Sequence, residues 1–297
     1  MQQPGKRDKE GFLLRGEEVS RIEAFVDASF AFAMTLLVIF YNDLPDTVTE
    51  LRQALLRVPT FVVCFVLLAM FWLGHNRWSR RFGIENAYTT ALSLALVLVV
   101  LVFVYPLRMV ISAFLGAISG GALPSELGID PANLAGDMQT AFIVYSVGVG
   151  VLSVILWLLN RHAQAQADEL QLDARECQLL LGEVGVQRIQ WLLAAASIAC
   201  SLILLGVDSP NSFLNSIPMW VFALSSFLLP MHWARVSRRL QAMEAAPLAA
   251  AAIAPAPSGE AVPATPNAAS TPAADSPKPR SGMPTSAAPI PRSARPS

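Results

Sequence analysis

The chain has 297 residues, a net charge of −1, and a composition that is 54% hydrophobic and only 14% charged. Soluble domains carry about 25% charged residues, so this composition predicts an integral membrane protein and argues against a nucleic-acid partner. The three cysteines, Cys64, Cys177 and Cys200, have neither the spacing of a metal site nor that of a disulfide framework.

Six apolar segments reach the length of about 20 residues that a helix needs to cross a bilayer. They cover approximately residues 22–41, 58–76, 88–110, 139–159, 189–207 and 214–233. We therefore expect an all-α, six-helix, multi-pass bundle. The chain divides into a cytoplasmic N-terminus at 1–20, a membrane domain at 21–240, and a Pro- and Ala-rich cytoplasmic tail at 241–297 that is predicted to be disordered.

Lys and Arg are concentrated before the first span, after the second, after the fourth and after the sixth. The positive-inside rule then places both termini in the cytoplasm of a protein of the cell membrane, with Arg52 and Arg57 as the exceptions. The connection at 115–138 contains Gly and Pro and is predicted to be an outer loop. The connection at 160–187 is rich in Ala, Gln, Leu and Glu, which predicts that it extends the fourth helix.

The first span begins with charged residues, and Asp27 lies deepest within it. A charge at the centre of a membrane helix costs about 2.5 to 3.5 kcal/mol on insertion scales, so Asp27 needs a partner. Because the second span runs back toward the inner face, Trp72 and His75 are expected at a similar depth. The pattern favours a structural tie between the two helices over a proton relay through Asp27 and His75.

Phe32, Leu36 and Ile39 recur at a spacing that places them on one face of the first helix. In a helix that is apolar all round, this periodicity does not distinguish a pore lining from a lipid-facing or packed surface. The chain contains none of the common enzyme motifs and no Cys/His metal grouping. We expect no enzyme activity, no cofactor and no metal site.

The segment at 21–39 reads RIEAFVDASFAFAMTLLVI, and the second span contains Phe71, Trp72 and His75. These residues resemble the transmembrane protein 175 family of potassium channels in its prokaryotic single-repeat form, whose pattern reads approximately RxxxFSDxVFAIxxTLLVL. The resemblance is close over the first two spans and extends to the other four by topology.

The resemblance implies a homotetramer in a lipid bilayer, with the first helices around a central path through which potassium ions pass. It assigns Phe32, Leu36 and Ile39 to an apolar constriction. It also implies that Arg21, Asp27, Trp72 and His75 form a polar cluster between the first two helices. Three positions depart from the pattern: Val26 replaces Ser, Ser29 replaces Val, and Phe32 replaces Ile, which makes the constriction bulkier.

The predicted function is therefore a potassium-permeable cation channel. Two other functions are also compatible with the residues. One is a proton-coupled secondary transporter that uses Asp27 and His75, although the chain lacks the paired broken spans typical of such proteins. The other is a non-conducting membrane scaffold, which the bulky Phe32 and the long tail suggest.

Overall fold

The structure is a computed structural model, and it describes residues 6–16, 18–39, 46–128, 130, 133–207 and 212–253. The chain divides into two compact units, Met1–Ala252 and Ile253–Ser297. Within the described residues, the regular secondary structure is helical apart from one isolated bridge between Arg7 and Leu13. This confirms the predicted all-α class.

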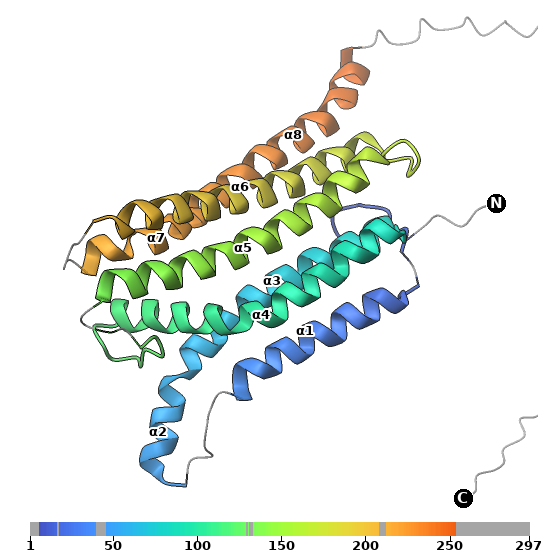
Figure 1. Cartoon of the computed structure of the whole chain (residues 1–297). Helices are drawn as coiled ribbons and strands as arrows, with labels where there is room; N and C mark the ends of the chain where they lie inside the picture. The colour runs from blue at the N-terminus through green and yellow to red at the C-terminus, as the bar shows by residue number, and fades with distance from the viewer. Residues whose placement is uncertain are drawn as a thin grey trace, which may run out of the picture. The chain divides into compact units, whose positions relative to one another are not determined.

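The described ranges contain eight helices, labelled in Figure 1. They are α1 (Arg21–Ile39), α2 (Val48–Leu56), α3 (Val58–Phe82), α4 (Ala87–Ile118), α5 (Leu134–Ala165), α6 (Ala174–Leu205), α7 (Ser212–Ala223) and α8 (Ser225–Ile253).

Five described stretches are long and apolar enough to cross a membrane: Val48–Phe82, Ala87–Ile118, Ala135–Ala165, Ala174–Leu205 and Phe213–Ala245. They contain four of the five later spans expected from the sequence, and the stretch that ends at Leu205 covers all but the last two residues of the predicted span 189–207. The first predicted span corresponds to α1, which has 19 residues and is not one of these five stretches. At 1.5 Å per residue α1 is roughly 28 Å long, close to the thickness of a hydrocarbon core. Its role as a sixth span stays a prediction.

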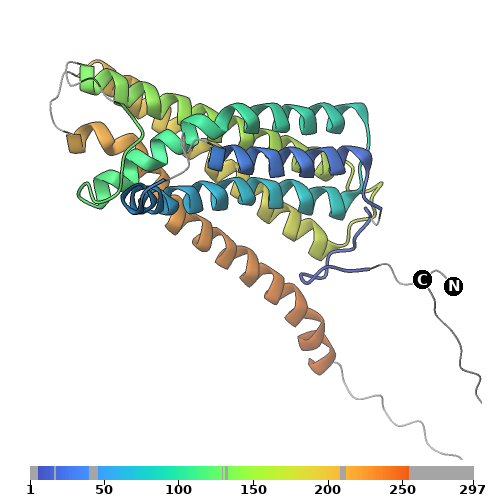
Figure 2. The same ribbon diagram turned by 90° about the horizontal axis from the view of Figure 1, so that it is seen from below.

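The long helices of the first unit pack side by side and alternate in direction (Figures 1 and 2). α5 pairs most extensively with α6 and also contacts α4, while α1 lies against α3 and α4. We call the end of the bundle where α1 begins and α3 ends the N-terminal end, and the opposite end the far end. α1 contributes Val26, Phe30, Ala33 and Leu37 to the buried core, and their spacing places them on one helical face.

Local signals explain several helix boundaries at the N-terminal end. α3 ends at Gly83, whose left-handed φ of 58° allows its N–H to bond the carbonyl of Ser79 at 2.8 Å. α4 begins with a capping box formed by Asn86 and Thr89. α6 begins with a second capping box, formed by Asp173 and Glu176.

The structure differs from the predicted boundaries at three places. α4 continues through Pro106 to Ile118, so the loop to α5 is shorter than the predicted 115–138. The 160–187 connection extends both neighbouring helices, because α5 runs to Ala165 and α6 already begins at Ala174. The last predicted span is divided at Leu224 into α7 and α8.

The predicted tail begins at residue 241, but α8 continues to Ile253. The remainder of the tail, from residue 254, lies outside the described residues. The division into a channel domain and a disordered tail therefore stays a prediction.

Candidate functional site

The first polar tie between helices joins α1 to α3. The indole N–H of Trp72 donates a hydrogen bond to Oδ1 of Asp27 at 2.7 Å. Both residues are half-buried. A hydrogen bond to a carboxylate is stronger than one between neutral groups. Asp27 therefore has a donor on the neighbouring helix, at the depth expected from the opposite directions of the two helices.

A second tie joins α3 to α4. His75 is 1% exposed, and its Nε2 lies 3.0 Å from the hydroxyl oxygen of Ser93. Nδ1 of His75 has no hydrogen-bond partner among the described residues. The described contacts include no hydrogen bond between His75 and Asp27. Of the expected cluster, Asp27 and Trp72 are thus hydrogen-bonded to each other, whereas His75 pairs with Ser93, which was not predicted.

Arg21 takes no part in either pair. Its side chain is exposed, and within the described ranges no hydrogen bond or ion pair involves it. Arg21 lies eleven positions before Phe32, about three helical turns, so the two residues share a face of α1. The structure therefore places Arg21 on the uncovered side of this helix.

One of the three expected constriction residues, Phe32, lies on that uncovered side. Phe32 is 55% exposed, and Phe25, one heptad earlier, is 50% exposed. Leu36 is half-buried at the edge of the core. Ile39 is the last residue of α1, and its side chain lies outside the described residues. In a single subunit, α1 thus buries one face against α3 and α4 and leaves a large apolar side chain, Phe32, uncovered.

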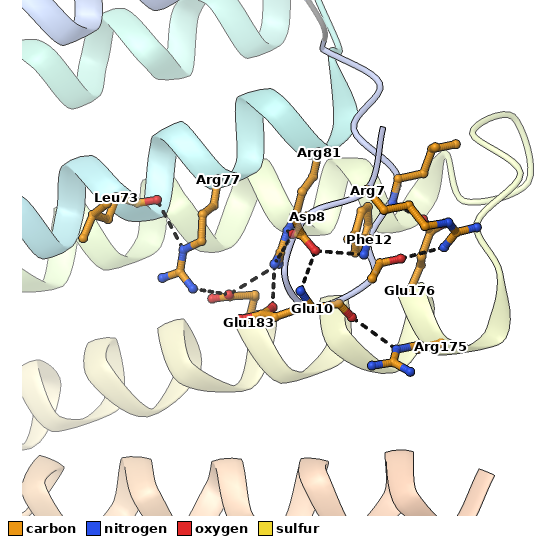
Figure 3. Close-up of polar contacts among 12 residues, drawn as sticks. Arg7, Asp8, Glu10, Phe12, Leu73, Arg77, Arg81, Arg175, Glu176 and Glu183 are labelled. Atoms are coloured by element: carbon orange, nitrogen blue, oxygen red, sulfur yellow. Dashed lines mark hydrogen bonds and ion pairs between the residues drawn. The ribbon is translucent and has the colours of Figure 1, made fainter. Parts of the chain in front are cut away.

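A third feature was not expected from the sequence. Residues 6–16, which we call the N-terminal clip, fold back onto the N-terminal end of the bundle (Figure 3). Phe12 is fully buried and packs edge-on against Phe82, with ring centroids 5.4 Å apart. The guanidinium of Arg81 lies 4.9 Å from the centroid of the Phe12 ring, within cation–π range. The clip therefore inserts an aromatic anchor against the end of α3.

Arg81 is the charged centre of this contact. Its guanidinium forms ion pairs with Asp8 at 2.8 Å and Glu10 at 2.5 Å, both in the clip, and lies 3.7 Å from Glu183 in α6. Arg77, one turn earlier, pairs with Glu183 at 3.0 Å. Because Arg81 is buried, these carboxylates compensate a charge that solvent reaches poorly.

The clip also contacts the start of α6. Glu176, which is 2% exposed, accepts hydrogen bonds from the backbone N–H of Leu13 at 2.7 Å and from Arg15 at 2.8 Å. The N–H of Gly16 then donates to the carbonyl of Arg80 at 3.1 Å. A Cβ at Gly16 would lie 2.7 Å from the carbonyl oxygen of Ser79, so only glycine fits this approach. The clip therefore connects the end of α3 to the start of α6.

The contacts of the clip change the pKa of the Asp8 carboxyl. Partial burial alone would raise the pKa of its carboxyl. Hydrogen bonds from the backbone N–H of Phe12 and from Arg81, together with the charge of Arg81, outweigh burial and lower the pKa below 3.8. Asp8 is therefore ionised at neutral pH, as its ion pair requires.

A family model, a curated protein and a solved structure are similar to this chain. Residues 21–106 match the family model described as "Endosomal/lysosomal potassium channel TMEM175". A protein named "Potassium channel" from Marivirga tractuosa is 28% identical over 220 residues, which cover 73% of this chain and 84% of that protein.

The fold is also similar to a crystal structure of a variant of the potassium channel MtTMEM175 in complex with a nanobody fusion protein. The TM-score is 0.63 at 23% sequence identity, and the match covers 80% of this chain and 100% of that chain. This likeness supports the fold. The resemblance read from the first two spans is confirmed by the family match, which includes both α1 and α3.

Proposed function

We propose that this chain, a relative of the TMEM175 potassium channels, forms a homotetrameric potassium channel in the cell membrane. In this proposal, four copies of α1 surround a shared path, and both termini lie in the cytoplasm. Phe32, Leu36 and Ile39 form the apolar constriction. Potassium ions pass down their gradient, and no cofactor takes part.

The observation that carries the proposal is the division of α1 into two faces. Val26, Phe30 and Leu37 are buried against the bundle, whereas Phe25 and Phe32 are about half exposed. Exposed apolar surface of this kind indicates a lipid contact or an interface. The family match favours an interface, because it includes the segment that contains α1.

The polar tie supports this arrangement by setting the rotation of α1. Asp27 lies five positions before Phe32, and five residues rotate a helix by about 140° from the starting face. When Asp27 bonds to Trp72 of α3, the side chain of Phe32 is therefore turned away from α3. In a tetramer, the same hydrogen bond in each subunit would direct Phe32 toward its three symmetry copies.

An apolar constriction controls conduction through its width and its hydration. A narrow ring of large side chains expels water, and an ion crosses only when the ring is wide enough to admit part of its hydration shell. Four phenylalanine side chains at position 32 would form such a ring. Smaller side chains there should admit more water, which would raise the flux and weaken discrimination between potassium and sodium.

The proposal is tested by flux into liposomes that contain the purified full chain. A potassium gradient should drive passive flux, and Phe32→Ala and Leu36→Ala should increase it several-fold and lower the potassium-to-sodium ratio. Phe227→Ala and Leu98→Ala are matched controls, because both residues are exposed apolar side chains on other helices. They should leave the flux unchanged.

Three outcomes would contradict the proposal. Liposomes that show no flux under any potassium gradient would favour a non-conducting scaffold. Uptake against the potassium gradient, driven by a pH gradient and lost in Asp27→Asn, would indicate a proton-coupled transporter. If the α1 substitutions and their controls change the flux equally, α1 does not line the ion path.

A further inference from the structure

A cavity of about 580 Å³ lies at the N-terminal end of the bundle. Its walls come from the end of the clip, the start of α1, the end of α3 and the start of α4. Its volume is within the range of pockets that hold small organic molecules. The polar residues that matter here are Arg15, Glu18, Glu23, His75, Glu85 and Ser93.

The cavity has an excess of negative charge. Glu18 and Glu85 are exposed, whereas Glu23 is only 3% exposed, so the carboxylates extend from solvent toward the interior. Arg15 is the positively charged residue among those lining the cavity, and Glu176 already pairs with it at 2.8 Å. The cavity therefore favours a cationic occupant over an anionic or neutral one.

Charged residues outside the cavity also act on the carboxylate of Glu23. Arg80 attracts its carboxylate, and Asp27 repels it. These two charges act on Glu23 in opposite directions, while burial also disfavours its charged form and a hydrogen bond with the side chain of Ser79 favours it. Asn76 is the nearest amide donor, 3.5 Å from Oε1 of Glu23, which is long for a hydrogen bond. Glu23 therefore keeps capacity to accept further hydrogen bonds.

His75 supplies a second and independent indication of an occupant. It lines the cavity and is 1% exposed, yet its Nδ1 has no hydrogen-bond partner among the described residues. Its Nε2 is already adjacent to the hydroxyl of Ser93. If Nε2 carries the proton and donates to Ser93, Nδ1 is an acceptor, and buried acceptors in proteins nearly always have a donor.

We propose that this cavity binds a small organic cation that carries primary ammonium groups. Glu18 and Glu85 attract the cation at the entrance, Glu23 pairs with an ammonium group inside, and Nδ1 of His75 accepts one of its N–H bonds. The occupant would contact α1 through Glu23 and α3 through His75. The proposal concerns binding alone, so it stands or falls independently of ion conduction.

Spermidine is the probe for the test, used with the purified full chain in detergent at constant ionic strength. Isothermal titration calorimetry should show saturable binding of one spermidine per chain. Glu23→Gln should weaken the affinity about tenfold or more, because it removes a buried charged acceptor. Glu85→Gln should weaken it about two- to fivefold, because that carboxylate is exposed.

Glu169→Gln is the matched control, because Glu169 is exposed and lies outside the cavity, in the turn between α5 and α6. It changes the charge by the same amount and should leave the affinity unchanged. If Glu23→Gln does not fold, the exposed Glu85 variant decides the question.

Several results would overturn the proposal. If spermidine shows no saturable binding, the cavity is not a site for such a cation. Equal losses of affinity in the cavity variants and in Glu169→Gln would indicate diffuse attraction to the surface. Binding of Mg²⁺ as tight as that of spermidine, with mutual displacement, would identify a site for inorganic cations instead.

Discussion

Each end of the bundle has a buried arginine that pairs with carboxylates, but the two arginines hold different segments. At the N-terminal end, Arg81 and Glu176 connect the clip to α3 and α6 through charged contacts. At the far end, α1 is held by apolar packing of Leu37 and by Arg108, which donates to the Leu37 carbonyl at 3.1 Å and pairs with Glu126 at 2.5 Å.

We expect stability to depend mainly on the N-terminal end and conduction on the uncovered face of α1. Substitutions at the N-terminal end should lower the free energy of unfolding, because they break buried polar contacts. Substitutions on the uncovered face of α1 around Phe32 should change the flux at little cost in stability, because that face is not packed within the subunit.

Arg81→Ala should have the largest effect. It leaves Asp8, Glu10 and Glu183 without their shared cation and removes the guanidinium from Phe12. Removal of one partner of a buried ion pair costs about 3 to 5 kcal/mol, and the partial exposure of Asp8 and Glu10 places this site near the lower value. Titration with sodium dodecyl sulfate in mixed micelles measures the loss. The exposed Arg238→Ala should change the free energy of unfolding by less than about 0.5 kcal/mol, and equal losses would refute the role of the clip.

Gly83→Ala should rank second. Gly83 has a φ of 58°, and a Cβ there would lie 3.1 Å from the backbone of Arg15 and of Gly16. Left-handed conformation in a residue other than glycine costs about 1 to 2 kcal/mol, and displacement of the clip adds to that cost. Gly120→Ala at the far end is the matched control, since its φ is 63° and no atom lies within 4 Å of the added Cβ. If both variants lose the same free energy of unfolding, the clip does not pack at Gly83 as described.

The bond between Trp72 and Asp27 should contribute a smaller amount. Trp72→Phe keeps an aromatic ring but removes the indole donor, and Asp27→Ala removes the carboxylate that accepts its hydrogen bond. A double-mutant cycle of unfolding free energies should give a coupling of about 1.5 kcal/mol, in the range for hydrogen bonds to charged groups. Additive single effects would show that the two side chains do not interact in the folded protein.

The smallest effect on the free energy of unfolding should come from protonation of Asp8 at low pH. Because the pKa of Asp8 is lowered in the folded protein, its carboxylate stabilises the clip at neutral pH. That stabilisation is lost as the pH falls below 3.8 and through the lower folded value. Asp8→Asn should therefore be less stable than the unsubstituted chain at pH 7, by less than the coupling between Trp72 and Asp27, and the difference should shrink below about pH 4. A difference that stays constant with pH would exclude this contribution of Asp8.

Much of the membrane bundle was predictable because it depends on the length of apolar segments and on the direction of neighbouring helices. The partnership of Asp27 with Trp72 follows from the same rule, since antiparallel helices place both residues at one depth. The helix at 87–118 extends beyond its predicted end near residue 110, because Arg108 is buried within the helix and pairs with Glu126 instead of marking its end.

The clip was not predictable in the same way. It has no helical or strand periodicity, and its contacts join Leu13 and Arg15 to Glu176, about 160 positions later in the chain. The one local signal is Phe12, a large aromatic residue within a charged segment. His75 is a similar case, because its partner Ser93 lies within an apolar run where serine has no distinctive pattern.

The most direct test of the central claim is the access of a thiol reagent to position 32 during ion flux. The test variant is Phe32→Cys, in a background with Cys177→Ser and Cys200→Ser and with the buried Cys64 retained. A positively charged, membrane-impermeant methanethiosulfonate reagent should reduce potassium flux strongly in this variant and leave Leu98→Cys in the same background unaffected. If the reagent leaves the flux through the Phe32→Cys variant unchanged, although mass spectrometry shows that the thiol has been modified, α1 does not line the ion path.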